Sequence, residues 1–306
     1  MPNSRLPTRV VKILDDEILE LHAGEEFGLY TALSYCWEGV QRFATTLATI
    51  GRNSMGCKRS DLPQTLQDAI LLTRMLGLQY IWIDSSCIIQ DSVADKLQEI
   101  PNMSLYYKNA YVTICAGGES CNQGFLQIHD ECEQHPGLGV TKHLLKLSYL
   151  CPDETVGTVY FYEESPYFLS WEPISRRAWT FQERLLSPRV LIYGSRLLWQ
   201  CHSAQHSDGG VEDWSFDTSA SDYRRLQINF TKVDESSKKQ PPKTDISSVQ
   251  YIDSSNDPFG SWYRAVHEFS RRQLTFPEDK LSAIAGFATE FSKLSGDEYL
   301  AGLWRS

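Results

Sequence analysis

Three short runs of apolar and β-branched residues stand out in the first two fifths of the chain, and each predicts a β-strand. They cover residues 30–36, 79–84 and 111–116 and contain almost no charged side chain. Between them, residues 62–76 and 94–109 repeat apolar residues with a helical period. This alternation is typical of parallel βαβ units. The pattern therefore predicts an α/β fold, with the three strands as neighbours in one mostly parallel sheet flanked by helices.

The second part of the chain has a different pattern. Residues 176–186 are predicted to be helical, and the apolar runs 190–193 and 196–201 flank Gly194, which indicates a β-hairpin. We expect residues 176–201 to pack against the first sheet and not to form a separate domain.

A long polar segment separates this hairpin from two further helical patterns. Residues 233–257 are rich in Ser, Lys and Pro and are predicted to be a mobile loop. Helical periods return at 262–272 and 278–291. We interpret the chain as a single domain over residues 1–306, with an α/β core at about 28–120 and a helix and hairpin elaboration at about 121–306.

The formal net charge of −10 argues against broad binding to a nucleic-acid backbone, which requires a basic surface. A small nucleotide ligand remains open, because a local site can oppose the global charge. We find no signal peptide at the N-terminus and no apolar run of the ~20 residues that a membrane span needs. The expected location is the cytoplasm.

The eight cysteines form no CxxC pair, so reduced thiols are expected. Cys87, at the end of a predicted strand, is interpreted as either a nucleophile or a buried inert thiol. Cys201, His202 and His206 lack a fourth ligand at a suitable spacing, and we therefore predict no metal site.

Several long segments are similar to motifs of one known family. Arg177 to Arg189 resembles its RgWTlQErlLSpR motif, and Tyr80 to Asp91 its YLWIDSLCIIQD core. On these segments, the chain resembles the fungal heterokaryon-incompatibility (HET) domain. The other matching segments are residues 30–37 (ALSYCWG), residues 62–69 (LPxTLxDA), Glu99 with Met103 and Asn109 (ExxxMxxxYxNA), and the flanks 6–9 and 299–304.

The sequence departs from the family pattern at Glu38, which precedes the usual glycine, and at Lys96, commonly a tryptophan in relatives. It also stops at Ser306, where relatives usually continue, so a short-form or truncated protein is expected.

The resemblance implies a signalling module in fungal non-self recognition and regulated cell death, acting through a protein partner or self-association. It also implies a fold remotely related to TIR domains, with a TIR/flavodoxin-like core. Some TIR domains cleave NAD, so one alternative is a nucleotide-processing enzyme, an NAD(P) glycohydrolase of TIR-like mechanism. A second alternative is a HET fold recruited to small-molecule metabolism. No cofactor is expected, although NAD could be a substrate.

Polar residues follow the predicted strands and are candidates for ligand binding. Ligands of doubly wound sheets bind beyond the carboxyl ends of the strands, where the segments 34–37, 84–87 and 116–118 should converge. The alternative interpretation is local capping of the next turn. The candidate ligand-binding residues are Ser34, Tyr35, Trp37, Asp84, Ser85, Gln90 and Asp91.

A dense polar cluster occupies the predicted helix at 176–186. We interpret it as a structural clamp between the two halves of the chain, and a role facing a substrate is the alternative. The cluster comprises Arg177, Trp179, Gln182, Glu183 and Arg184.

Glu99 is the candidate catalytic residue of the enzyme alternative. Its predicted helix begins near the ligand edge, where a carboxylate could bind ribose hydroxyls and stabilise an oxocarbenium-like transition state. Tyr35 or Trp37 could stack on the ligand. The structural alternative is that Glu99 favours the positive end of the helix dipole or pairs with Lys96. The helical period places a row of residues along one side, namely Leu97, Ile100, Ser104 and Tyr107.

Overall fold

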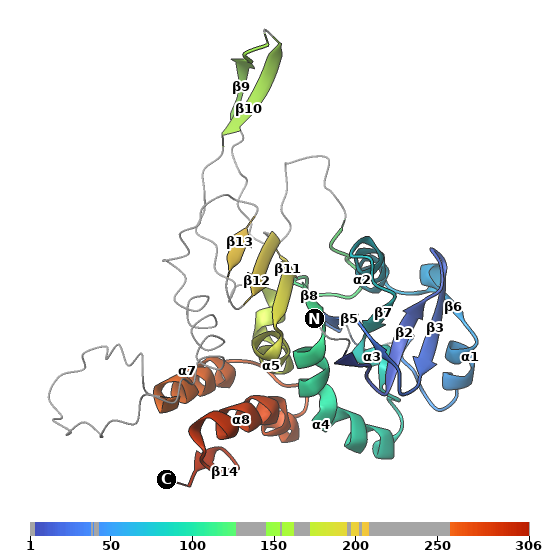
Figure 1. The fold of residues 1–306 in the computed structure, drawn as a ribbon, viewed down its shortest axis with the longest axis vertical. Coiled ribbons are helices and arrows are strands. Elements are labelled where there is room, and N and C mark those ends of the chain that lie inside the picture. The colour runs from blue at the N-terminus through green and yellow to red at the C-terminus, as the bar shows by residue number, and fades with distance from the viewer. Residues whose placement is uncertain are drawn as a thin grey trace, which may run out of the picture.

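A computed structural model describes residues 4–37, 39, 43–126, 145–153, 155–161, 172–194, 197–201, 204–207 and 258–305. Its main feature is a sheet of nine described strands in the order β13-β12-β11-β8-β5-β7-β2-β3-β6 (Figure 1). The strands are β2 (Arg9–Ile13), β3 (Ile18–Ala23), β5 (Tyr30–Ser34), β6 (Cys57–Lys58), β7 (Tyr80–Trp82), β8 (Val112–Ala116), β11 (Arg189–Tyr193), β12 (Leu197–Cys201) and β13 (Gln205–Ser207).

Four parallel strands form the centre of the sheet. β5 pairs in parallel with β7 on one side and with β8 on the other, and β8 pairs in parallel with β11. Every residue of β5 and β8 is buried, as expected for strands covered on both faces. The prediction that the three apolar runs are neighbours in one sheet is therefore confirmed.

The sheet as a whole is mixed, which corrects the expectation of a mostly parallel sheet. Three pairings are parallel, whereas β11–β12, β12–β13, β2–β7, β2–β3 and β3–β6 are antiparallel. At one end the predicted hairpin around Gly194 forms β11 and β12, and at the other the N-terminal hairpin pairs with β7. That hairpin precedes residue 28, where the α/β core was predicted to begin. It nevertheless belongs to the sheet, since Val11 and Ile81 are cross-strand partners.

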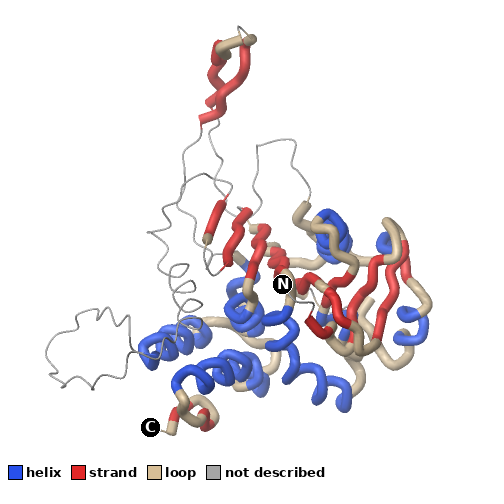
Figure 2. Tube along the Cα trace, viewed as in Figure 1, coloured by secondary structure: helices blue, strands red, loops and turns tan. Residues whose placement is uncertain are grey.

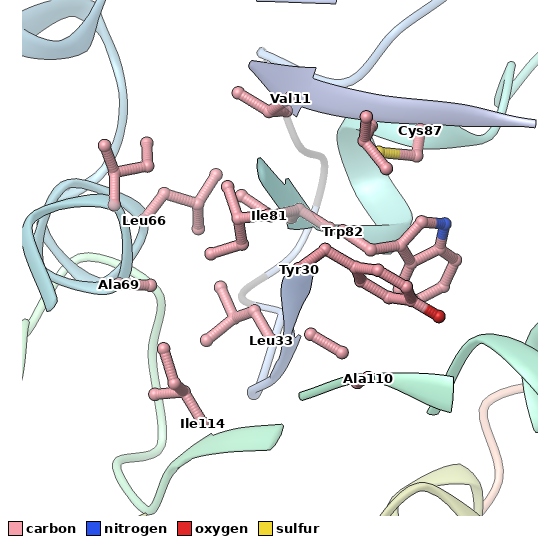
Figure 3. Packing of buried hydrophobic residues seen from close by; sticks show 14 of the residues in the cluster. Val11, Tyr30, Leu33, Leu66, Ala69, Ile81, Trp82, Cys87, Ala110 and Ile114 are labelled. Carbon is pink, nitrogen blue, oxygen red and sulfur yellow. The ribbon is translucent and has the colours of Figure 1, made fainter. Parts of the chain in front are cut away.

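Helices cover both faces of the parallel centre (Figure 2). α2 (Gln64–Met75) lies on one face, where the hydroxyls of Thr31 and Thr73 are hydrogen-bonded at 2.7 Å. α4 (Val93–Asn109) lies on the other, where the rings of Trp82 and Tyr107 meet edge to face. Figure 3 shows this division: the side chains of Leu33, Ile81 and Ile114 point toward Leu66 and Ala69 of α2, whereas those of Tyr30 and Trp82 point the other way.

The buried side of α4 differs from the predicted one. The helix buries Glu99, Met103, Tyr106 and Tyr107, and Leu97 is 75% exposed. Met103 follows Glu99 by four residues, and Tyr106 and Tyr107 follow Met103 by three and four, so all of them lie toward one helical face. Packing of the two tyrosines against Trp82 selects this face.

A second apolar cluster lies beside the sheet. α5 (Trp179–Leu186), α7 (Pro258–Ser270) and α8 (Ser282–Ser295) enclose it, with α5 between the sheet and α8 (Figure 1). Phe181, Trp262 and Phe287 are at its centre. Since β11 belongs to the main sheet, residues 176–201 pack against it as predicted. The predicted loop at 233–257 lies outside the described residues.

The remaining elements are short or peripheral. No helix within the described ranges combines the length and apolar character needed to cross a membrane. The short or peripheral elements are β1 (Ser4–Arg5), β4 (Phe27–Gly28), α1 (Ile50–Ser54), α3 (Asp84–Cys87), the hairpin β9 (Leu145–Leu150) and β10 (Val156–Phe161), β14 (Tyr299–Leu300), β15 (Leu303–Trp304), and 3-10 turns at Arg59–Asp61, Pro173–Arg176 and Pro277–Lys280.

Candidate functional site at the carboxyl ends of the parallel strands

Polar side chains that follow β5 and β7 meet at the carboxyl edge of the sheet. The indole Nε1 of Trp37 donates to Asp84 Oδ2 at 3.0 Å, and the hydroxyl of Tyr35 donates to Ser85 Oγ at 2.8 Å. β5 connects to β7 on one side and is followed spatially by β8 on the other, so this edge lies where the strand order reverses. The structure thus brings together Tyr35, Trp37, Asp84 and Ser85.

Asp84 belongs to both the edge and the next helix. Its Oδ1 accepts a hydrogen bond from the backbone N–H of Ser85, the next residue of α3, at 2.7 Å, and the residue as a whole is half-buried. Burial raises the pKa of the Asp84 carboxyl to about 6 and outweighs the opposing effect of the Arg177 guanidinium.

Arg177 connects this edge to the segment that leads into α5. Its guanidinium donates to the carbonyl oxygen of Tyr35. Its backbone forms an isolated parallel bridge with Gln273, which follows α7. One side chain thereby joins the end of β5 to the helical half of the chain.

Glu183 is a second acid in this region, and it is buried. Burial raises the pKa of its carboxyl to about 7; the Ser34 hydroxyl opposes this rise and the Asp84 charge adds to it. Two neighbouring carboxyl groups therefore have raised pKa values, beside one guanidinium that lowers both. Such a pair can take up a proton near neutral pH.

The other residues of the predicted clamp contact three different parts of the fold. Gln182 Oε1 accepts from the backbone N–H of Gly286 in α8 at 3.2 Å. Arg184 Nη2 donates to Gln200 Oε1 in β12 at 2.9 Å. The half-buried Trp179 packs against both the sheet core and the helical cluster. These contacts are internal to the chain.

Gln90 and Asp91 hold local backbone. Gln90 Nε2 donates to the carbonyl oxygens of Asp84 and Ile88 at 3.0 and 3.1 Å, and Asp91 Oδ1 accepts from the backbone N–H of Leu47 at 2.8 Å. The bond of Asp91 joins the segment before α1 to the segment after α3. Both residues thus bind backbone groups of the chain itself, and a role in ligand binding stays a prediction.

Glu99 lies in a separate cluster on the inner face of α4. It is 1% exposed, its Oε2 accepts from the hydroxyl of Tyr106 at 2.7 Å, and its Oε1 is 3.9 Å from Arg9 Nη2. Arg9 also forms an ion pair with Asp95 at 2.6 Å. The contacts of Glu99 are with β2 and its own helix, and none of them reaches Asp84. A catalytic role for Glu99 stays a prediction. Its contacts with Tyr106 and Arg9 are consistent with a structural role.

Sequence reasoning did not identify Glu172 as a contributor to this edge. A Cβ on Gly194 would lie 2.4 Å from Glu172 Oε1, and a Cβ on Gly117 would lie 3.0 Å from Glu172 Oε2. Gly117 directly follows β8 and Gly194 directly follows β11, so Glu172 lies against two strand ends at close range. The two glycines are evident in the sequence, but nothing in the sequence indicates that the side chain of Glu172 packs against them.

Cys87 is a buried thiol, and burial raises its pKa to about 12. This favours the inert interpretation, because a nucleophilic cysteine needs a lowered pKa. Within the described ranges, no group of three His, Cys, Asp or Glu side chains is arranged to hold a metal ion.

Comparison with known proteins places these segments in one family. The model of the family described as heterokaryon incompatibility protein (HET) matches residues 30–183, half of the chain. No curated protein and no solved structure matches. The matched range contains β5, β7, β8 and the Asp84 edge with Arg177 and Glu183. The chain therefore belongs to the HET family, which ties it to heterokaryon incompatibility.

Proposed function

We propose that this chain is a signalling module in fungal non-self recognition and regulated cell death, and that it acts through contact with a protein partner or a second copy. This proposal extends the general link to heterokaryon incompatibility that family membership provides.

An exposed apolar row on α4 carries this proposal. Val93 and Leu97 are 74% and 75% exposed, and Pro101 and Leu105 follow at the same four-residue spacing, also exposed. Side chains four apart lie one above the other on a helix. Contiguous apolar surface of this kind is typical of protein interaction sites.

The internal use of the acidic residues supports the same proposal. Glu183 is buried against the sheet, and Glu99 is sealed against Tyr106. These carboxylates contribute contacts within the fold, as expected for a module whose function depends on its surface.

A double substitution on α4 tests the signalling role. Val93→Glu with Leu97→Glu places two charges on the exposed row, and both positions tolerate polar groups because water already surrounds them. Expression of the wild-type chain in fungal cells is expected to reduce colony formation, and the double variant is expected to restore it at equal protein level.

Leu71→Glu with Met75→Glu is the matched control, because these two side chains are 38% and 72% exposed on α2, on the other face of the sheet, at the same four-residue spacing. It should kill cells as the wild type does. Equal toxicity of the α4 variant and this control would contradict the proposal.

The alternative, an NAD(P) glycohydrolase with NAD as its substrate, has one specific observation in its favour. The carboxylate of the half-buried Asp84, the indole of the half-buried Trp37 and the Arg177 guanidinium meet at the edge where doubly wound sheets bind ligands. An indole can stack on a base, a carboxylate can bind ribose hydroxyls and a guanidinium can bind phosphate.

Nicotinamide release from NAD by the purified chain tests this alternative. If the site is catalytic, Asp84→Asn is expected to lower kcat/KM by about 100-fold or more, because it removes the charge that would stabilise the transition state. Glu99→Gln is expected to lower the melting temperature, since it removes the charge beside the half-buried Arg9. If the wild-type chain releases nicotinamide no faster than the Asp84→Asn variant, the enzyme alternative is contradicted.

A further inference from the structure

A cavity of about 690 Å³ lies where β3, α1 and β6 meet, over the antiparallel end of the sheet. Val11, Leu19 and Leu21 give it an apolar floor, and Phe43 and Leu62 also line it. Its volume is in the range of small-molecule sites, roughly 300–1,000 Å³. The Asp84 edge does not include these residues.

One wall of this cavity is polar and held in place by its own hydrogen bonds. Asn53 Nδ2 donates to Thr45 Oγ1 at 3.0 Å, and Thr45 Oγ1 donates to the carbonyl oxygen of Ser86 at 2.6 Å. Among the described residues, the amide oxygen of Asn53 and the hydroxyl of Ser86 have no hydrogen-bond partner. One acceptor and one hydroxyl therefore remain for a ligand.

The charged residues of the cavity balance one another. Arg52 and Lys58 are basic and Glu20 and Asp61 are acidic, so the formal charge of the lining is zero. A site for a phosphate or a carboxylate is expected to have an excess of positive charge. The balance instead favours a ligand without net charge.

We propose that this cavity binds a small amphipathic molecule without net charge. Its apolar body lies on Leu19 and Leu21, and its hydrogen-bonding end meets Asn53 and Ser86. This inference does not depend on the proposed signalling role, because it concerns a different surface from the α4 row and the Asp84 edge.

Cys57 offers a reporter within the site. It lines the cavity and is half-buried, so a bound molecule shields its thiol from alkylation by N-ethylmaleimide. Cys151, also half-buried, follows β9 outside the cavity and serves as the internal control. Mass spectrometry of the two cysteine-containing peptides gives both rates from one sample.

Two dyes with the same ring system form the matched probes. N-phenyl-1-naphthylamine is uncharged, and 1-anilinonaphthalene-8-sulfonate adds one sulfonate. With the uncharged dye at ten times its Kd, alkylation of Cys57 is expected to slow about tenfold by mass action, and that of Cys151 is expected to stay the same. The sulfonate dye is expected to protect Cys57 less at the same concentration.

Two variants of Asn53 complete the test. Asn53→Ala and Asn53→Phe both remove the bond to Thr45, but only phenylalanine adds a ring to the cavity. Protection by the uncharged dye is expected to weaken in the alanine variant, which lacks the amide oxygen, and to be lost in the phenylalanine variant, whose ring also fills the cavity. Equal protection of Cys57 and Cys151, or stronger protection by the sulfonate dye or by NAD, would overturn the proposal. These comparisons need only the wild-type chain, so they decide even if the phenylalanine variant does not fold.

Discussion

Replacing Gly286 with alanine is expected to lower the free energy of unfolding by roughly 2 kcal/mol, because overpacking outweighs the helix propensity that alanine adds. A Cβ at this position would lie 2.2 Å from the Cβ of Ser104 in α4 and 2.9 Å from Gln182 Oε1 in α5. The Ser104 Cβ is attached to the backbone of its helix and cannot rotate away, so α8 must move. Denaturant unfolding of the two chains measures the difference.

Gly51→Ala is the matched control for this substitution. Gly51 lies in α1, and nothing is within 4 Å of the position that its Cβ would take. Alanine there is expected to leave the protein as stable or to stabilise it by up to about 1 kcal/mol. If the chain with Gly286→Ala unfolds at the same denaturant concentration as this control, the close approach of α4, α5 and α8 is wrong.

Lowering the pH from 8 to about 5.5 is expected to stabilise the fold, on the order of 3 kcal/mol, through Asp84 and Glu183. Their folded-state pKa values are about 6 and about 7, above the ordinary values of 3.8 and 4.5 for these side chains. Between those limits the folded state binds more protons than the unfolded state, so stability falls as the pH rises through the folded pKa values. Thermal unfolding across this pH range measures the slope.

The variant with Asp84→Asn and Glu183→Gln should lose most of this slope, because neither amide titrates. The control with Asp61→Asn and Glu278→Gln makes the same change in net charge at exposed positions and should retain the slope. An unchanged slope in the first variant would show that the two carboxyl groups are ordinary acids in the fold.

The parallel centre of the sheet could be predicted because its signal is local. β5, β7 and β8 are apolar runs, and the helical periods between them require parallel connections. The antiparallel end could not be predicted in the same way. Lys12 and Glu20 are cross-strand partners in two charged strands, and β2 meets β7 only because Val11 and Ile81 pair across the sheet.

The site was predictable in part for the same reason. Tyr35, Trp37, Asp84 and Ser85 follow strand ends, and parallel strands bring their ends to one edge. Glu99 shows what the sequence leaves open. Its helix was predicted, but the rotation of that helix depends on Trp82 receiving Tyr106 and Tyr107, and this rotation turns Glu99 inward to Arg9.

Strands outside the family match supply hydrogen-bond partners to strands inside it. A chain limited to residues 30–183 would leave out β2 and β11, so β7 and β8 would both present unpaired backbone N–H and C=O groups. It would also end inside α5, before Leu185. Open edges of buried, apolar strands pair readily with other chains. We therefore expect this segment to aggregate on its own. The matched range identifies the family, but its limits are not those of a folding unit.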